Sequence, residues 1–316
     1  MPESISLTQA THGVLNLCKS HGSTSMDAIR ILKKLTKAKR IGHAGTLDPI
    51  ATGVLPVCFG QATKLMEFLI NSTKKYRGVI MLGVTTDTYD SQGREVSRGN
   101  WENITKSQVE AVLSSFIGSI LQVPPMYSAL KHDGQRLYSL ARAGEDVYRP
   151  PRPVHVSGVK LLNWEPPLIT IEVECGRGFY MRSFAYDVGE SLGCGAHLSA
   201  LVRTRTGSLS EDSSITLDDF AELVRAGDWQ ASLIAPDGVL GNMAAISISA
   251  AAERFIRTGQ EVSIPGTEIE TRHLEMRRAY NGRQEFVGIL RFNRTRNLWK
   301  SERIFNLPVP SSYAPE

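Results

Sequence analysis

Apolar residues follow a helical spacing in three stretches of the chain. Over residues 24–38 they recur at i, i+4 and i+7, which predicts a helix with one buried face. Ser23, Thr24 and Ser25 stand at its start and offer hydroxyls that can cap the first turn. An apolar stripe over residues 109–116 predicts a second helix that begins after Thr105, and a third helix is predicted over residues 180–192.

Strands are predicted where β-branched and aromatic residues cluster without helical spacing. Such clusters occupy residues 54–59, 76–82 and 168–175. In the second cluster Tyr76 and Ile80 share a face, because side chains alternate along a strand. Strands interspersed with helices predict a mixed α/β core for this part of the chain.

The pattern changes to short strands towards the end of the chain. Residues 285–292 and 299–305 predict two of them, and Asn281 followed by glycine is a hairpin signal. We therefore divide the chain into a large domain, residues 1–240, and a small β-rich domain, residues 241–316.

One segment of the large domain breaks these patterns. Residues 123–153 are rich in prolines, tyrosines and basic side chains. A long irregular segment inside a folded domain is usually functional or disordered. We therefore predict an irregular insertion of one of these two kinds.

Composition narrows the class of protein only in part. The 316 residues are 41% hydrophobic and 22% charged, which is ordinary for a folded protein with a core. No uninterrupted apolar run is long enough to span a bilayer, and the first residues lack a secretory signal. We therefore expect a cytoplasmic protein without a membrane partner. The net charge of +4 is compatible with a polyanionic partner without establishing one.

The cysteine and histidine patterns argue against a metal site. The four cysteines are scattered and form no C-x-x-C pair, which is unlike a zinc ribbon or a redox motif. His43 has no second metal-ligand residue at binding spacing. A lone loop histidine usually forms hydrogen bonds or stacks, and for His43 we favour stacking on a nucleobase over the role of a general base.

Asp48 lies in a glycine-rich stretch, between Gly45 and Gly53. An aspartate before a proline is most often a turn or cap residue. Here the flanking glycines allow the backbone to approach a ligand closely, and a basic helix precedes the stretch. The cations of that helix fit either a solvated face or a phosphate-binding patch. They are Arg30, Lys33, Lys34, Lys37, Lys39 and Arg40.

Tyr76 and Arg182 are two further candidates for chemistry. By default Tyr76 is a half-buried strand aromatic, but its ring and hydroxyl would equally suit a base flipped out of an RNA stack. Arg182 falls in the first turn of a predicted helix, where a cation is unfavourable for the helix dipole. We therefore expect a buried carboxylate to pair with it.

Residues 42–56 closely resemble the catalytic motif of the TruB family of bacterial tRNA pseudouridine-55 synthases. Overall the resemblance covers roughly residues 13–216. One departure is near the start, where the family usually has Asp-Lys-Pro and this chain keeps only Lys19. Four further stretches resemble family motifs in the family's order: residues 74–77, 86–93, 125–131 and 193–198.

The resemblance implies a fold and an activity. The family combines a mixed-sheet α+β pseudouridine synthase catalytic domain with a small C-terminal β-rich domain similar to PUA, an RNA-binding module. It isomerises uridine to pseudouridine in the T-loop of tRNA, without a metal or organic cofactor. By this resemblance the insertion at residues 123–153 grips the T-arm. We expect a monomer that needs no guide RNA.

The resemblance also assigns site residues. Asp48 falls on the family's catalytic aspartate and Tyr76 on its base-stacking tyrosine. Arg182 matches the arginine of a Tyr-x-Arg motif, and we expect this third catalytic residue to keep Asp48 charged. Four further residues match substrate-binding positions: Lys19, His43, Tyr180 and Leu201.

Alternatives remain open for the chemistry and for the class of protein. Asp48 must be ionised either to attack C1′ of the ribose or to take a proton from C2′, and the resemblance does not decide between these routes. A guide-dependent relative from the box H/ACA branch shares the catalytic motif, although the insertion after Val123 favours a stand-alone enzyme. A protein that only binds or folds tRNA, with a structural Asp48, is the rival from a different class.

Overall fold

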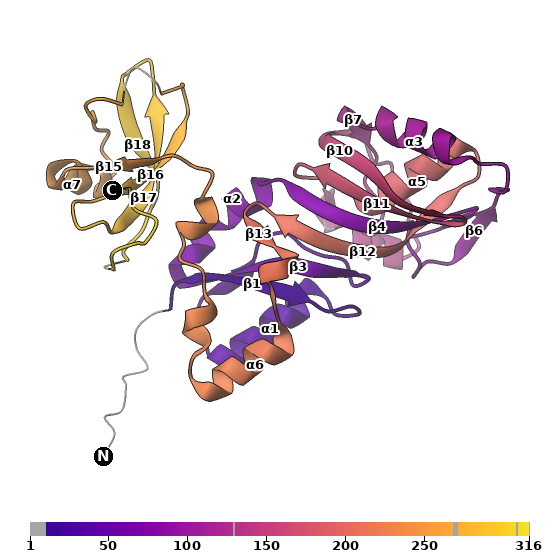
Figure 1. The fold of residues 1–316 in the computed structure, drawn as a ribbon, viewed down its shortest axis with the longest axis horizontal. Coiled ribbons are helices and arrows are strands. Elements are labelled where there is room, and N and C mark those ends of the chain that lie inside the picture. The colour runs from indigo at the N-terminus through magenta and orange to yellow at the C-terminus, as the bar shows by residue number, and fades with distance from the viewer. Residues whose placement is uncertain (1–10, 129, 268–270, 308, 316) are drawn as a thin grey trace.

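The chain folds around one large curved sheet and a small sheet at the other end of the molecule (Figure 1). This computed structural model describes residues 11–128, 130–267, 271–307 and 309–315. The large sheet has the order β14-β1-β3-β12-β4-β11-β10-β7, with β2 paired to β3 and β13 to β12. Its strands are β1 (Gly13–Lys19), β2 (Ile41–His43), β3 (Ala51–Phe59), β4 (Lys74–Leu82), β7 (Gly118–Gln122), β10 (Arg152–Glu165), β11 (Leu168–Cys175), β12 (Ala196–Thr206), β13 (Leu209–Ser210) and β14 (Ile215–Thr216).

Strand β12 joins the two halves of the large sheet. It runs parallel to β3 on one side, with Leu201 opposite Ala51. On the other side it is antiparallel to β4, with Arg203 opposite Tyr76. The three strands predicted in this region are present as β3, β4 and β11. Residues in the middle of β12 are therefore close to both halves.

Helices cover the large sheet in two groups (Figure 1). α1 and α6 pack together beside β1 and β2, whereas α3 and α5 lie against β10, β12 and β4. Thr24 caps α1 in a capping box with Asp27, and the predicted face with Leu32 is buried. The other two predicted helices are present as α3 and α5. The helices are α1 (Ser25–Thr36), α2 (Met66–Asn71), α3 (Lys106–Ser115), α5 (Met181–Leu192) and α6 (Leu217–Ala226), with 3-10 turns η1 (Gly60–Leu65), η2 (Glu211–Ser213), η3 (Trp229–Ser232) and η4 (Gly238–Leu240).

One apolar cluster holds these layers together. Leu32 of α1, Leu55 of β3 and Phe184 of α5 are all fully buried in it. Burying such a side chain stabilises the fold by about 1.5–3 kcal/mol. The layers therefore form a firm base for the loops at the strand ends.

Residues 123–153 are more ordered than predicted. A short hairpin leads into a helix, and Met126, Leu137 and Leu140 form a small apolar cluster of their own. The prediction of an irregular segment is wrong in this respect, because elements this short contain too few repeats of apolar spacing to be detected. The short elements are β8 (Lys131–His132), β9 (Gln135–Arg136) and α4 (Leu137–Arg142), and a similar hairpin is formed by β5 (Val84–Thr86) and β6 (Glu95–Arg98).

The small sheet has the order β15-β16-β17-β18. β16 and β17 form the hairpin that the Asn-Gly pair predicted, with Tyr280 opposite Phe286. Phe292 and Trp299 pack against each other in its core. The predicted small β-rich domain is thus present. Its elements are β15 (Ala245–Ser247), α7 (Ala250–Arg257), β16 (Met276–Tyr280), β17 (Phe286–Asn293) and β18 (Leu298–Ile304).

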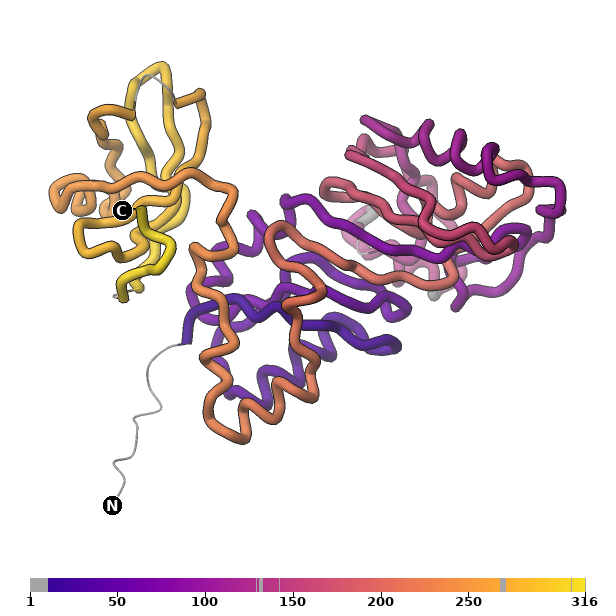
Figure 2. Tube along the Cα trace, in the orientation of Figure 1, coloured from indigo at the N-terminus to yellow at the C-terminus, as the bar shows by residue number. Residues whose placement is uncertain are grey.

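A second apolar cluster joins the small sheet to the large one. It contains Val14 from β1, Phe305 just after β18, and Leu240 between the two sheets. Tyr280 donates a hydrogen bond to Asp237 across the same junction, at 2.8 Å. Figure 2 shows the chain passing through this packed region from one sheet to the other. The predicted division of the chain at residue 240 stays a prediction.

Two remaining expectations concern the membrane and residues outside the description. In the part of the chain that the structure covers, no helix is long and apolar enough to cross a membrane. Residues 1–10, where a secretory signal was judged missing, lie outside the described residues. So does Ala129, which belongs to the motif at residues 125–131.

Candidate active site

A cavity of about 900 Å³ opens beside the middle of the large sheet. Its walls come from the loop between β2 and β3, from β4 and β12, from the start of α5 and from the insertion. The fold thus brings together residues that are far apart in the sequence. Five of the seven predicted site residues line the cavity: Asp48, Tyr76, Tyr180, Arg182 and Leu201.

Asp48 lies on a loop that is held on both sides. Gly53 has a φ of +92°, and a Cβ there would come within 2.4 Å of the Arg203 carbonyl oxygen, so this position requires glycine. Before Asp48, the Ser25 hydroxyl accepts a hydrogen bond from the Leu47 N–H at 2.9 Å. The same hydroxyl donates to the Leu47 carbonyl at 3.2 Å. The start of α1 therefore fixes the approach to Asp48.

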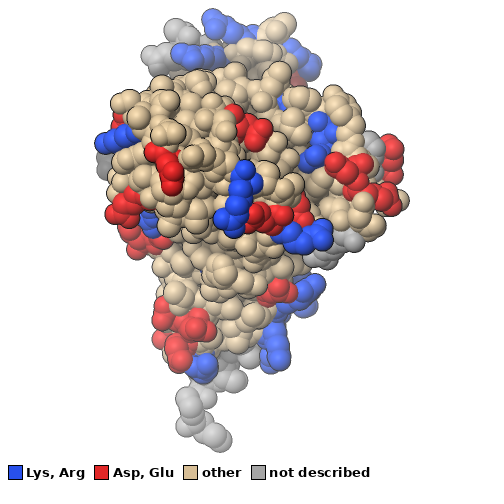
Figure 3. Space-filling model, turned by 90° about the vertical axis from the view of Figure 1, so that its right-hand side faces the viewer, with Lys and Arg blue, Asp and Glu red and all other residues tan. Residues whose placement is uncertain are grey.

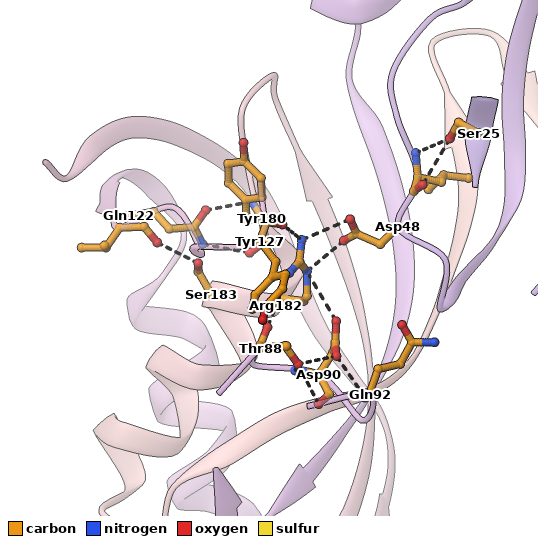
Figure 4. A network of polar contacts seen from close by, with 12 residues as sticks. Ser25, Asp48, Thr88, Asp90, Gln92, Gln122, Tyr127, Tyr180, Arg182 and Ser183 are labelled. Atoms are coloured by element: carbon orange, nitrogen blue, oxygen red, sulfur yellow. Dashed lines mark hydrogen bonds and ion pairs between the residues drawn. The ribbon is translucent and has the colours of Figure 1, made fainter. Parts of the chain in front are cut away.

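Arg182 holds Asp48 in a two-point ion pair (Figure 4). Its Nε donates to Oδ2 at 2.9 Å and its Nη2 to Oδ1 at 3.1 Å. The Arg182 side chain is 4% exposed and that of Asp48 is 36% exposed, so the carboxylate reaches the cavity with its partner buried behind it. Arg182 is in the first turn of α5, where the helix dipole disfavours a cation. The expected carboxylate partner is present and offsets this cost.

Arg182 also faces a second carboxylate and two carbonyls (Figure 4). Its Nε lies 3.7 Å from an Asp90 oxygen, and its Nη2 donates to the Tyr127 carbonyl at 2.7 Å. A longer contact, 3.5 Å, joins Nη1 to the Thr88 carbonyl. Asp90 is fixed in turn by the Thr88 hydroxyl at 2.6 Å and by the Gln92 N–H at 3.0 Å. Arg182 is therefore the centre of a network that includes the insertion through Tyr127.

Tyr76 and Leu201 form neighbouring parts of the cavity wall, on β4 and β12. Burial raises the pKa of the Tyr76 phenol, whereas the charge of the Arg203 guanidinium acts in the opposite direction. Leu201 is almost fully buried. The wall therefore combines an apolar surface with one hydroxyl.

Tyr180 stands at the N-terminal end of α5, before Arg182. Its N–H donates to the Gln122 side-chain oxygen at 2.8 Å, and its carbonyl accepts from the Gln122 side-chain nitrogen at 3.1 Å. Burial raises the pKa of its phenol. β7 and the insertion thus hold the start of α5.

Lys19 and His43 do not line the cavity. The Lys19 ammonium donates to the carbonyls of Ser20 and Ser23, both at 2.8 Å, which supports the turn before α1. Burial lowers its pKa to about 8, although the charge of Asp48 acts in the opposite direction. Burial also lowers the pKa of His43, whose Nδ1 is buried and has no partner among the described residues. Substrate contacts by these two residues stay predictions.

Several polar residues at the cavity were not singled out by the sequence, among them Asp90, Arg203 and Lys74. Asp90 lies in the family-like motif at residues 86–93 and Lys74 in the one at residues 74–77, and these motifs were the signals available. Arg203 and Lys74 are strand residues of the cavity wall. Both are buried, at 1% and 6% exposed, whereas charged residues on strands ordinarily face solvent.

The site places a carboxylate and a phenol at one cavity. Asp48 can act as a nucleophile or as a base towards a ligand bound there, and the Tyr76 hydroxyl can exchange a proton with it. Within the described ranges, no group of three or more His, Cys, Asp or Glu residues is arranged to hold a metal ion.

Two family models match the chain. Residues 33–181 match the TruB family pseudouridylate synthase (N terminal domain), and residues 182–239 match the tRNA pseudouridylate synthase B C-terminal domain. The tRNA pseudouridine synthase B of Dehalococcoides mccartyi is 38% identical over 296 residues, which cover 93% of this chain and 96% of that protein. That of Thiobacillus denitrificans is 42% identical over 281 residues, covering 89% and 92%.

Solved structures share the fold at lower sequence identity. A chain of a Cbf5-Nop10-Gar1 complex aligns with a TM-score of 0.74 and 23% identity, covering 97% of this chain and 88% of that chain. A chain of an H/ACA RNP bound to a substrate RNA containing 2′-deoxyuridine aligns with a TM-score of 0.72 and 22% identity, with the same coverage. These similarities confirm the predicted mixed-sheet α+β fold with a small β-rich domain.

Proposed function

Because this chain belongs to the TruB family of tRNA pseudouridine synthases, which are isomerases, we propose that its substrate is the uridine at position 55 in the T-loop of tRNA. The observation that carries the proposal is the partly exposed carboxylate of Asp48, held by Arg182 in the lining of a cavity. The named relatives, which are 38% to 42% identical over most of the chain, support the substrate class.

The reaction exchanges one glycosidic bond for another. The bond between N1 and C1′ breaks, the base turns, C5 bonds to C1′, and the C5 proton then leaves. Asp48 is the group that acts at the sugar, either on C1′ or on the C2′ proton. The base must first leave its stack, which costs a few kcal/mol that contacts in the pocket offset.

The cavity wall offers roles for the remaining residues. The Tyr76 ring stacks on the flipped base, and its hydroxyl takes the C5 proton. Leu201 packs against the base, and Tyr180 closes the wall near Arg182. Arg182 holds the Asp48 carboxylate and orients it at the cavity, because two nitrogens of its guanidinium donate to the two carboxylate oxygens.

Binding of the T-arm is assigned to the insertion and to the cations of α1. Lys33, Lys34 and Lys37 are exposed, as phosphate contacts require. The Tyr127 carbonyl contacts Arg182, so the insertion reaches the catalytic network.

The end of the molecule formed by β6, β7 and α3 is a less suitable RNA surface. Figure 3 shows acidic and basic side chains interspersed among uncharged ones there. Some of them neutralise each other, as Arg98 and Glu95 do at 2.6 Å. A mixed pattern of this kind does not create the single-sign field that attracts phosphates.

The proposal includes the form of the enzyme. We propose a cytoplasmic monomer that works without guide RNA, in which the small β-rich domain is PUA-like and adds RNA contacts. The length of the insertion, which carries its own hairpin, helix and apolar cluster, supports a stand-alone enzyme.

The test is conversion of an unmodified tRNA transcript by the purified chain, with no guide RNA and no added cofactor. We expect many turnovers per enzyme and pseudouridine at the T-loop position only. A transcript with cytidine at that position is the matched control and should give no product. Conversion that depends on a guide RNA, or tight tRNA binding without product, would contradict the proposal.

A further inference from the structure

A second arginine, Arg203, is buried at the cavity without an anionic partner. The residue is 1% exposed and belongs to the cavity lining. Arg182, at a similar depth, faces the carboxylates of Asp48 and Asp90. No Asp or Glu in the described part of the chain forms an ion pair with Arg203. Removing a charge from water costs several kcal/mol, so its contacts must explain why a cation is kept there.

Two hydrogen bonds tie Arg203 to the segment that carries Asp48. Its Nε donates to the Val54 carbonyl at 2.6 Å, and its Nη2 donates to the Gly45 carbonyl at 2.9 Å. Asp48 lies between these two acceptors in the sequence. A Cβ at Gly45 would stand 3.4 Å from Arg203 Nη1, so the loop backbone packs directly on the guanidinium. Arg203 therefore clamps both ends of the Asp48 loop.

On its other side Arg203 faces Tyr76. The two residues are direct partners in the pairing of β12 with β4. Directly opposite residues of an antiparallel pair carry their side chains on the same face of the sheet, so the guanidinium and the phenol lie on one face. Both residues also line the cavity. The charge of Arg203 opposes the rise in the Tyr76 pKa that burial causes.

We propose that Arg203 is a positioning residue for the isomerisation, which holds the Asp48 loop and presents an unneutralised positive charge to the Tyr76 hydroxyl. The charge favours the deprotonated oxygen that accepts the C5 proton, so this inference rests on the proposed function. In that step the C5–H bond breaks and its electron pair forms the C5=C6 bond. The C6=N1 pair moves to N1, which takes a proton from water, and the C5 proton moves to the Tyr76 oxygen.

The first experiment compares Arg203→Met with Arg203→Lys in single-turnover assays at saturating tRNA. We expect Arg203→Met to lower the rate about 10²-fold at neutral pH. The decrease should become smaller as the pH rises, because Tyr76 then loses its proton even without the charge of Arg203. Arg203→Lys keeps the charge and should retain more of the rate. Arg205→Met removes an arginine of the same strand that pairs with Glu174, and it should leave the rate unchanged.

A double variant tests whether Arg203 acts through Tyr76. In the Tyr76→Phe background the hydroxyl is already absent, so Arg203→Met should lower the rate much less than it does in the wild type. If Arg203→Met lowered the rate equally in both backgrounds and by the same factor at every pH, Arg203 would only support the Asp48 loop. That result would overturn the proposal.

A second measurement does not depend on activity. The phenolate absorbance of wild type minus that of Tyr76→Phe isolates the titration of Tyr76 in the folded protein. In the Arg203→Met background this difference absorbance should appear at higher pH, because Tyr76 then ionises less readily. In the Arg203→Lys background its pH midpoint should stay closer to that of the wild type. An unchanged titration would overturn the inference, whereas an inactive wild type with the expected shift would contradict the proposed function alone.

Discussion

Two groups of charged residues in this chain show how their surroundings determine what a charge does. In the cavity, Arg182 is 4% exposed and faces the carboxylates of Asp48 and Asp90. On α1, Lys33 and Lys34 are exposed, and neither forms an ion pair with any residue that the structure describes. The charges in the cavity are held in one geometry by their partners, whereas the exposed lysines of α1 are available to bind a ligand.

The difference between the two groups is one of desolvation. Removing one partner of a buried ion pair costs about 3–5 kcal/mol, because the other charge stays buried without a counterpart. Even an exposed ion pair contributes only about 0–1 kcal/mol to stability, because both charges stay in water. Substitutions in the cavity should therefore stop chemistry, whereas those on α1 should change RNA binding in small, salt-dependent steps.

Tyr76→Phe should give one of the largest losses, because it removes a hydroxyl and keeps the ring. We expect the single-turnover rate at saturating tRNA to fall about 10²–10⁴-fold, with nearly normal tRNA affinity. An intermediate that retains the C5 proton should accumulate. Tyr76→Leu should weaken binding as well, by about 1–3 kcal/mol of stacking. A Phe variant with a normal rate would leave Tyr76 a stacking residue only.

Arg182→Ala tests the buried side of the comparison directly. The Asp48 carboxylate would lose both of its charge-assisted hydrogen bonds, and the rate at neutral pH should fall about 10²–10³-fold. Arg182→Lys keeps the charge without the fork, so its rate should lie between those of Ala and wild type. A normal rate in the Ala variant, measured in single turnover on folded protein, would show that the ion pair is not required.

Lys74 extends the comparison to stability. Its ammonium donates to the carbonyls of Leu69, Ile70 and Ser72, and burial lowers its pKa from 10.5 to about 8. Between these two values the unfolded chain binds more protons than the folded one, so the free energy of unfolding rises with pH in this window.

Lys74→Met removes that pH-dependent contribution. The free energy of unfolding of wild type minus that of the variant should grow by up to about 3 kcal/mol from about pH 8 to about pH 10.5, since one pKa unit corresponds to about 1.4 kcal/mol. Urea unfolding at both ends of the window measures it. A difference that does not change with pH would contradict the buried, destabilised ammonium.

Replacing Lys33, Lys34 and Lys37 with Ala tests the exposed side. Binding of tRNA should weaken, and the slope of log affinity against log salt should become shallower by about 2–3, because fewer counterions are released. The rate at saturating tRNA should stay near wild type. The charge-matched control replaces Arg98, Lys106 and Lys160 with Ala. An equal change in the salt slope of this control would show that the cations of α1 are only a solvated face.

Local structure could be predicted where apolar spacing is regular and one face is exposed. β11 matches its predicted range, because buried and partly exposed residues alternate along it. β1 was missed, since all but one of its residues are buried and leave no alternation to read. The shared core at Leu240 could not be foreseen either, because it depends on contacts between distant segments.

The residues of the candidate site also differ in whether local sequence can predict them. A continuous motif around Asp48 was enough to find the carboxylate, and the helix dipole argument alone required a partner for Arg182. Arg203 carries no such local signal, and Asp90 has only its place in a family-like motif, because their burial and their contacts are tertiary. A charged residue in a strand is expected to face solvent until the neighbouring strands are known.

The central claim is that Asp48 serves the reaction and not the binding of tRNA, and Asp48→Asn tests it most directly. The amide keeps the size of the side chain and removes its charge. We expect tRNA affinity near wild type and a single-turnover rate at least about 10³-fold lower at saturating tRNA, as for loss of a group used in the chemical step. Pseudouridine formation at close to the wild-type rate by the folded Asn variant would contradict the account.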